Sequence, residues 1–72
     1  MQKLDLIAIT LNDTQERVPA HSSLKTIIGR FAESDPDLIV ELNGRFVYPR
    51  AYDATIVSEG DRLEFINPNF GG

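Results

Sequence analysis

The residues best suited to take part in chemistry are the last two of the sequence, Gly71 and Gly72. Glycine has no side chain and loses the most backbone entropy on ordering, so a diglycine contributes little to a packed core. A Gly-Gly segment is instead slim enough to thread a narrow channel and present a carboxylate to the catalytic groups of another protein. The alternative is an ordinary frayed terminus, where small residues are common.

The other reactive side chains are few and scattered. The chain has no cysteine, which excludes a thiol nucleophile, a disulfide framework and a thiolate metal site. His21 is the only histidine and has no second ligand near it, so we predict no metal site. Asp35 and Asp37 flank Pro36, and we interpret them as turn residues, because an acid–base pair needs a cleft. We therefore predict that the chain is not an enzyme by itself and holds no cofactor.

Length and charge narrow the class of protein. The 72 residues, of which 42% are hydrophobic, suffice for one compact domain but leave little room for a deep pocket. Eleven acids against seven bases give a net charge of −4, which argues against nucleic-acid binding and suits a basic partner surface. There is no signal pattern and no apolar run of membrane length, so we expect a cytoplasmic protein, with a monomer as the default state.

Residues 3–18 predict a β-hairpin. Residues 3–11 are apolar on both alternating faces, as expected of a central strand that is covered on much of both sides. Asn12-Asp13-Thr14 is a turn signal, and residues 15–18 predict a shorter, more polar strand that Pro19 ends.

A helix follows, with Ser22 or Ser23 as its N-cap and an end near residues 32–34, before Pro36. Its apolar residues recur at intervals of three and four and predict one buried stripe, formed by Leu24, Ile27, Ile28 and Phe31. Gly29 costs about 1 kcal/mol relative to alanine within a helix, and we expect close packing against the sheet to explain it.

The second half of the chain predicts three further strands. Residues 38–42 and 45–48 flank Asn43-Gly44, the strongest short hairpin signal, because both turn residues tolerate positive φ. Residues 50–57 have no clear period and predict a crossover with a turn of helix. Residues 62–66 predict the last strand.

One amphipathic helix can cover only one face of such a sheet, which implies a two-layer α+β domain. We predict a β-grasp fold, with a mixed sheet of four to five strands packed on one main helix. In this interpretation residues 1–66 form the domain, and residues 67–72 form a flexible C-terminal tail that ends in the diglycine.

Four stretches of the sequence occur together over nearly the whole chain. The hairpin and the striped helix come first, and residues 40–47 then read V-x-x-N-G-x-x-V, with Pro49-Arg50 after them. Residues 57–65 contain a V-x-x-G-D-x-L-E run, and Gly71-Gly72 comes last. In this order the stretches resemble the ThiS-type sulfur carriers, small ubiquitin-like proteins of thiamine biosynthesis.

The resemblance implies a carrier and not an enzyme. An E1-like adenylating enzyme of the ThiF type would use ATP to activate the carboxylate of Gly72 as an acyl-adenylate. A sulfur donor would then convert this group to a thiocarboxylate, which delivers sulfur to thiazole synthase or to another sulfur-accepting enzyme. Gly71 would provide the flexible approach to the reacting residue.

Two features depart from the common family pattern. Asn67-Pro68-Asn69-Phe70 precedes the diglycine, and Tyr48 stands before Pro49-Arg50. Because partner enzymes grip the tail, these departures leave the receiving pathway open. A sulfur carrier for cysteine or for homocysteine and methionine biosynthesis is the close alternative. A ubiquitin-like protein modifier and a plain interaction module with an idle tail are the other possibilities.

Partner contacts are expected on the tail and on the exposed face of the sheet. Phe70 would anchor the tail in a partner groove, because aromatic residues are enriched at binding anchors. Alternation places only one parity of each strand on the exposed face. The candidate docking residues are Phe46, Tyr48, Arg50, Arg62, Leu63 and Phe65.

Overall fold

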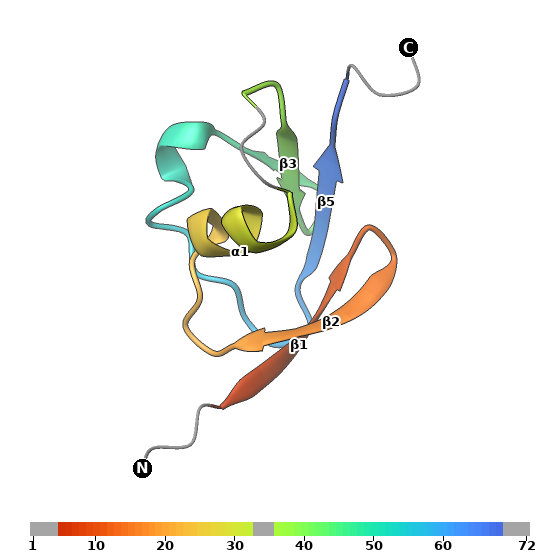
Figure 1. The fold of residues 1–72 in the computed structure, drawn as a ribbon, viewed down its shortest axis with the longest axis vertical. Coiled ribbons are helices and arrows are strands. Elements are labelled where there is room, and N and C mark those ends of the chain that lie inside the picture. The colour runs from red at the N-terminus through yellow and green to blue at the C-terminus, as the bar shows by residue number, and fades with distance from the viewer. Residues whose placement is uncertain (1–4, 33–35, 69–72) are drawn as a thin grey trace.

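The computed structural model describes residues 5–32 and 36–68, which form a five-stranded sheet, one α-helix and a short 3₁₀ helix (Figure 1). In chain order the elements are β1 (Leu6–Leu11), β2 (Thr14–Pro19), α1 (Leu24–Phe31), β3 (Ile39–Leu42), β4 (Arg45–Val47), η1 (Pro49–Ala51) and β5 (Arg62–Ile66). The predicted helix and all five predicted strands are present, and η1 is the expected turn of helix in the crossover.

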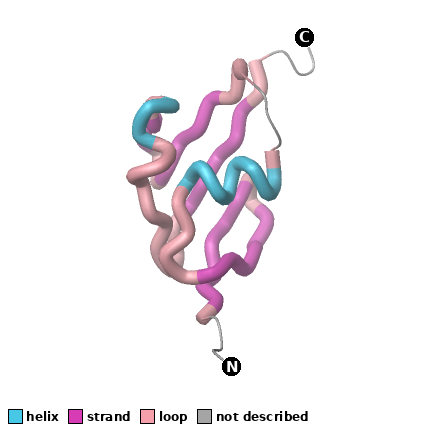
Figure 2. The backbone as a smooth tube through the Cα atoms, turned by 60° about the vertical axis from the view of Figure 1, so that its left-hand side comes forward, coloured by secondary structure: helices cyan, strands magenta, loops and turns pink. Residues whose placement is uncertain are grey.

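The sheet is mixed, with strand order β2-β1-β5-β3-β4. β1 and β5 run parallel, and the other neighbouring strands are antiparallel. α1 lies across one face of the sheet, as Figure 2 shows. This arrangement confirms the predicted β-grasp fold and places the last strand, β5, at the centre of the sheet.

Both hairpins are closed by two-residue turns in which both residues have positive φ. The φ angles are 48° at Asn12, 67° at Asp13, 53° at Asn43 and 82° at Gly44. Asparagine, aspartate and glycine adopt this region more readily than other residues do. The turn chemistry therefore favours both hairpin registers locally.

α1 begins after Ser23, one of the two predicted N-caps. The Ser23 hydroxyl accepts a hydrogen bond from Thr26 N at 3.1 Å, which satisfies one free amide of the first turn. Arg30 lies in the last turn, where a cation meets the negative end of the helix dipole. Gly29 contradicts our expectation, because it is exposed and no atom outside its own helix turn lies within 4 Å of the Cβ position. Packing against the sheet does not explain this glycine.

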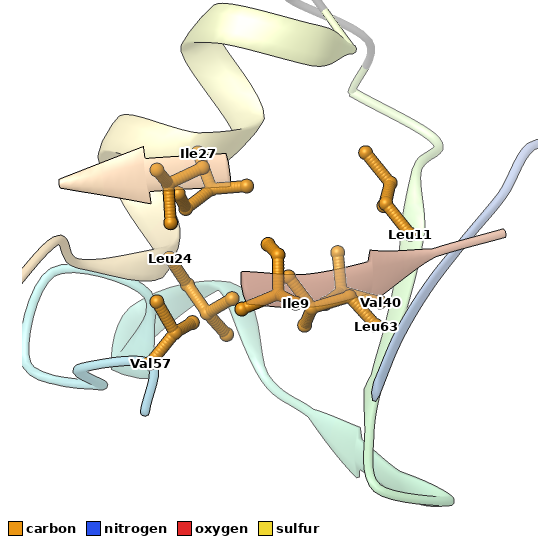
Figure 3. Packing of buried hydrophobic residues seen from close by; sticks show 8 residues of the cluster. Ile9, Leu11, Leu24, Ile27, Val40, Val57 and Leu63 are labelled. Atoms are coloured by element: carbon orange, nitrogen blue, oxygen red, sulfur yellow. The ribbon is translucent and has the colours of Figure 1, made fainter. Parts of the chain in front are cut away.

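The core fills the space between α1 and the covered face of the sheet (Figure 3). Its buried side chains are Ile9, Leu11, Val18, Leu24, Ile27, Val40, Val57 and Leu63. The predicted helix stripe is confirmed, with Leu24 and Ile27 fully buried and Ile28 and Phe31 packed at the margin. β1 differs from expectation, because a single helix covers only one of its faces, and Leu6 is 54% exposed.

Candidate functional site

The predicted tail, residues 67–72, follows the central strand in the sequence. β5 ends at Ile66, at the end of the sheet away from the start of β1 (Figure 1). β3 pairs with β5 as far as Ile66, whereas the pairing of β1 with β5 stops at Leu63. The predicted site residues Phe70, Gly71 and Gly72 lie outside the described residues.

The face of the sheet that α1 leaves uncovered carries an apolar surface next to the start of the tail. The register places Ile39 opposite Ile66 and Glu41 opposite Phe46, and directly opposed residues share one face of a sheet. We define the open-face patch as Ile39, Phe46, Tyr48 and Ile66. Phe46 is 49% exposed, Tyr48 57% and Ile66 39%, so these side chains are available to a partner.

Three of the predicted docking residues meet where β4 leads into η1. The rings of Phe46 and Tyr48 pack edge to face, with centroids 4.7 Å apart and an interplanar angle of 89°. The guanidinium carbon of Arg50 lies 5.1 Å from the centroid of the Tyr48 ring, a cation–π contact. The patch therefore presents aromatic surface with a positive charge at its margin.

The remaining strand candidates divide between the two faces of β5. Leu63 and Phe65 face α1, since Leu63 is 1% exposed and belongs to the core and Phe65 packs half-buried against it. The expectation that both lie on the exposed face is corrected, and Leu63 has no surface to offer a partner. Arg62, by contrast, is exposed and has the parity of the open face, together with Glu64 and Ile66.

Sequence reasoning missed Ile39 and Ile66 as members of the patch. The sequence contains part of the information needed to find Ile39. The Asn43-Gly44 turn pairs β3 with β4 and so assigns alternate residues of both strands to one face. The pairing of β3 with β5, which places Ile66 beside Ile39, could not be predicted from the sequence, because no short turn connects these two strands.

The open face also carries two opposed carboxylates. Glu41 lies directly opposite Glu64 across β3 and β5, and opposite Phe46 across β3 and β4. Like charges opposed in this way repel each other. A cationic group placed over this pair from outside would relieve the repulsion.

Within residues 5–32 and 36–68, no group of three or more His, Cys, Asp or Glu side chains could hold a metal ion. Over the same residues, no helix is long and apolar enough to cross a membrane. Burial raises the pKa of Tyr52, which follows η1 and packs against the core.

The sequence model of the ThiS family matches residues 5–72. The chain belongs to the ThiS family. It is similar to the solved structure of the thiamine biosynthesis protein ThiS from Geobacter metallireducens, with 28% sequence identity and a TM-score of 0.77. The match covers 92% of this chain and 100% of the Geobacter chain. No curated protein sequence matches this chain significantly.

The two turn motifs that carry the resemblance to the ThiS family are joined to each other in the fold. Asn43 Nδ2 donates to Asp61 Oδ1 at 3.0 Å, and Asn43 Oδ1 accepts from Arg62 N at 2.9 Å. The other Asp61 oxygen accepts from Ser58 N at 2.7 Å, across the turn in which Gly60 has a φ of 84°. The Asn-Gly and Gly-Asp motifs of this ThiS-family chain therefore form one network that holds the start of β5.

Proposed function

We propose that this chain is a sulfur carrier and not an enzyme, and that the carboxylate of Gly72 is adenylated and then converted to a thiocarboxylate. The observation that carries the proposal is the match to the ThiS family, which includes Gly71-Gly72. The geometry of the described residues supports it, because the tail starts from the central strand beside an exposed apolar patch.

The proposed chemistry solves a problem of reactivity. A carboxylate is a poor electrophile, because it has no good leaving group. Attack of a Gly72 carboxylate oxygen on the α-phosphorus of ATP would release pyrophosphate and form an acyl-adenylate. Hydrosulfide would then attack the acyl carbon and expel AMP with loss of a proton. The resulting thiocarboxylate holds a nucleophilic sulfur atom that can be passed to an acceptor. Because the activation requires ATP, we assign the carrier to the cytoplasm.

An E1-like adenylating enzyme of the ThiF type is the proposed first partner, with the open-face patch as its docking surface. Aromatic side chains such as Phe46 and Tyr48 often supply much of the binding energy of an interface. The repulsion between Glu41 and Glu64 favours a partner with basic groups around an apolar centre. Ile66 belongs to the patch and also precedes the tail, so a bound partner would fix the point from which the tail extends.

The length of the tail limits how far the partner's catalytic groups can lie from the docking surface. Residues 67–72 can span at most about 20 Å when extended, so the partner's catalytic groups must lie within that distance of Ile66. We propose Gly71 as the thin approach to the reaction site. Phe70 is the proposed anchor of the tail in a groove of the partner.

Thiazole synthase is the proposed acceptor of the sulfur. The support is the similarity to the thiamine biosynthesis protein ThiS from Geobacter metallireducens. A carrier for cysteine or homocysteine formation would use the same activation with a different acceptor enzyme. Incubation of the thiocarboxylated chain with thiazole synthase and its other substrates separates these cases, because only the thiamine carrier yields thiazole product.

Intact mass spectrometry tests the carrier role directly. The chain is incubated with ATP, sulfide and the ThiF-type enzyme of the same organism. We expect a mass increase equal to the replacement of one oxygen atom by sulfur, localised to Gly72 by fragmentation. Deletion of Gly72, or addition of an alanine after it, should abolish the increase and leave the circular dichroism spectrum and melting temperature unchanged.

Two results would contradict the proposal. One is no mass increase with an enzyme that modifies another carrier under the same conditions. The other is a full mass increase in the chain that lacks Gly72. Lysine-linked conjugates of this chain in cell extracts would instead identify a protein modifier.

A further inference from the structure

The parallel pairing of β1 with β5 stops at Leu63, before β5 itself ends at Ile66. Thr10 N donates to Asp61 O at 2.9 Å and Asn12 N donates to Leu63 O at 3.0 Å, two successive rungs of a parallel ladder. After Leu11 the chain turns away into the β1–β2 hairpin. The β1 side of β5 would therefore be left without main-chain partners at Phe65, two residues before the tail begins.

The side chain of Asn12 supplies the missing rung. Phe65 N donates to Asn12 Oδ1 at 2.8 Å, and Asn12 Nδ2 donates to Phe65 O at 3.2 Å. The N–H and C=O of one strand residue point to the same side of the strand. A single carboxamide therefore satisfies both backbone groups of Phe65 and acts as a peptide group at the position where β1 no longer runs.

Asparagine combines the two properties that this position requires. Residue 12 has a φ of 48°, a region that asparagine, aspartate and glycine populate more readily than other residues. Only asparagine among these three has both a carbonyl acceptor and an amide donor in its side chain. Aspartate would keep the acceptor and present a second oxygen to Phe65 O, and glycine would keep neither group.

We propose that Asn12 is a positioning residue for the tail, because its carboxamide anchors β5 at Phe65 and so sets the point and direction from which residues 67–72 leave the sheet. The inference rests on the proposed carrier function for its consequence in activity. Without the anchor, β5 keeps its pairing with β3 at Phe65 and Ile66 and loses the side-chain contact from the β1–β2 turn. A less firmly held end of β5 would lower the effective concentration of Gly72 in a partner's channel.

A matched control exists in the other hairpin turn. Asn43 also has a positive φ, 53°, and its carboxamide also makes two hydrogen bonds at β5, to Arg62 N and to Asp61. Those bonds lie at the start of β5, away from the tail. The variants N12G and N43G therefore remove the same chemical group from equivalent turns and differ in which end of β5 they release.

Amide hydrogen exchange measured by NMR is the first readout. We expect N12G to accelerate exchange of the Phe65 amide by about fivefold to tenfold and to leave the Arg62 amide near its original rate. N43G should give the reverse pattern, and N12D should lie between N12G and the unmodified chain at Phe65. Unchanged Phe65 exchange in N12G would overturn the inference.

The second readout is the rate of Gly72 modification by the adenylating enzyme at saturation, together with the Kd for docking. N12G should lower the saturated rate by about twofold to fivefold with little change in Kd, and N43G should leave both near the original values. Equal slowing by both variants, or a change in Kd alone, would overturn the positioning role. If the unmodified chain takes up no sulfur, the carrier proposal fails, and the exchange pattern still decides whether Asn12 anchors the strand.

Discussion

Gly29 lies on the exposed side of α1, where the structure gives no steric reason for a glycine. Its φ is not in the left-handed region, and a Cβ would meet no atom outside its own helix turn within 4 Å. Alanine costs less backbone entropy at such a position. At the scale of the single residue, this glycine is a weak point of the helix.

We predict that Gly29→Ala stabilises the domain by about 0.5–1 kcal/mol. Chemical denaturation followed by circular dichroism measures the change. Gly60→Ala is the contrasting variant, because Gly60 has a φ of 84°, and we expect it to destabilise the domain by about 1 kcal/mol or more. A loss of stability in the Gly29 variant would contradict the prediction that alanine fits at this exposed position of α1 without steric conflict.

At the scale of elements, β5 is the strand on which the fold and the site both depend. β3 and β1 flank it, the Asn43–Asp61 network holds its start, and Asn12 holds its end. The side chains of two hairpin turns therefore secure a strand that is distant from both turns in sequence. This explains in physical terms why the Asn-Gly and Gly-Asp motifs occur together.

Asp61 gives a test of this network. We predict that Asp61→Ala lowers the free energy of unfolding by about 1–3 kcal/mol, because it removes the acceptors of Ser58 N and Asn43 Nδ2. Asp53→Ala removes the same charge from an exposed position on the crossover and should change stability by less than about 0.5 kcal/mol. Equal effects of the two substitutions would show that the loss of a negative charge, and not the loss of the network, changes the free energy of unfolding.

At the scale of the whole molecule, α1 covers one face of the sheet, and no helix of residues 5–32 and 36–68 covers the other (Figure 2). That face carries the open-face patch at the end where the tail begins and the exposed Leu6 at the other end. The docking surface that we propose and the start of the tail are therefore adjacent. The same partner can hold the domain and receive the tail.

We predict that Phe46→Ser and Tyr48→Ser each weaken binding to the ThiF-type enzyme by about tenfold or more, because each removes an aromatic contact from the centre of the proposed interface. Isothermal titration calorimetry measures the affinity, and thermal unfolding checks that the fold is intact. Leu6→Ser is the matched control, since Leu6 is 54% exposed on the same face but far from Ile66. Equal weakening by all three variants would argue against this location of the interface.

Much of the fold follows from local patterns in the sequence. The apolar stripe of residues 24–31, the two serines before it and the two hairpin turn signals predicted the elements and their order, because each pattern depends on neighbours a few residues apart. The bounds of β5 were predicted as observed. The Gly-Gly pair and the turn motifs also pointed to the family that the comparison of sequences identifies.

The tertiary structure alone decided which side of each strand faces a partner. The sequence correctly predicts that Leu63 and Phe65 share one face of β5. Only the position of α1 shows that this face is the covered one. The hydrogen bonds between Asn12 and Phe65 join residues 53 positions apart, and no local pattern encodes such a contact. Periodicity specifies that a strand has two faces, whereas the pairing of distant strands and the packing of the helix determine which face is buried.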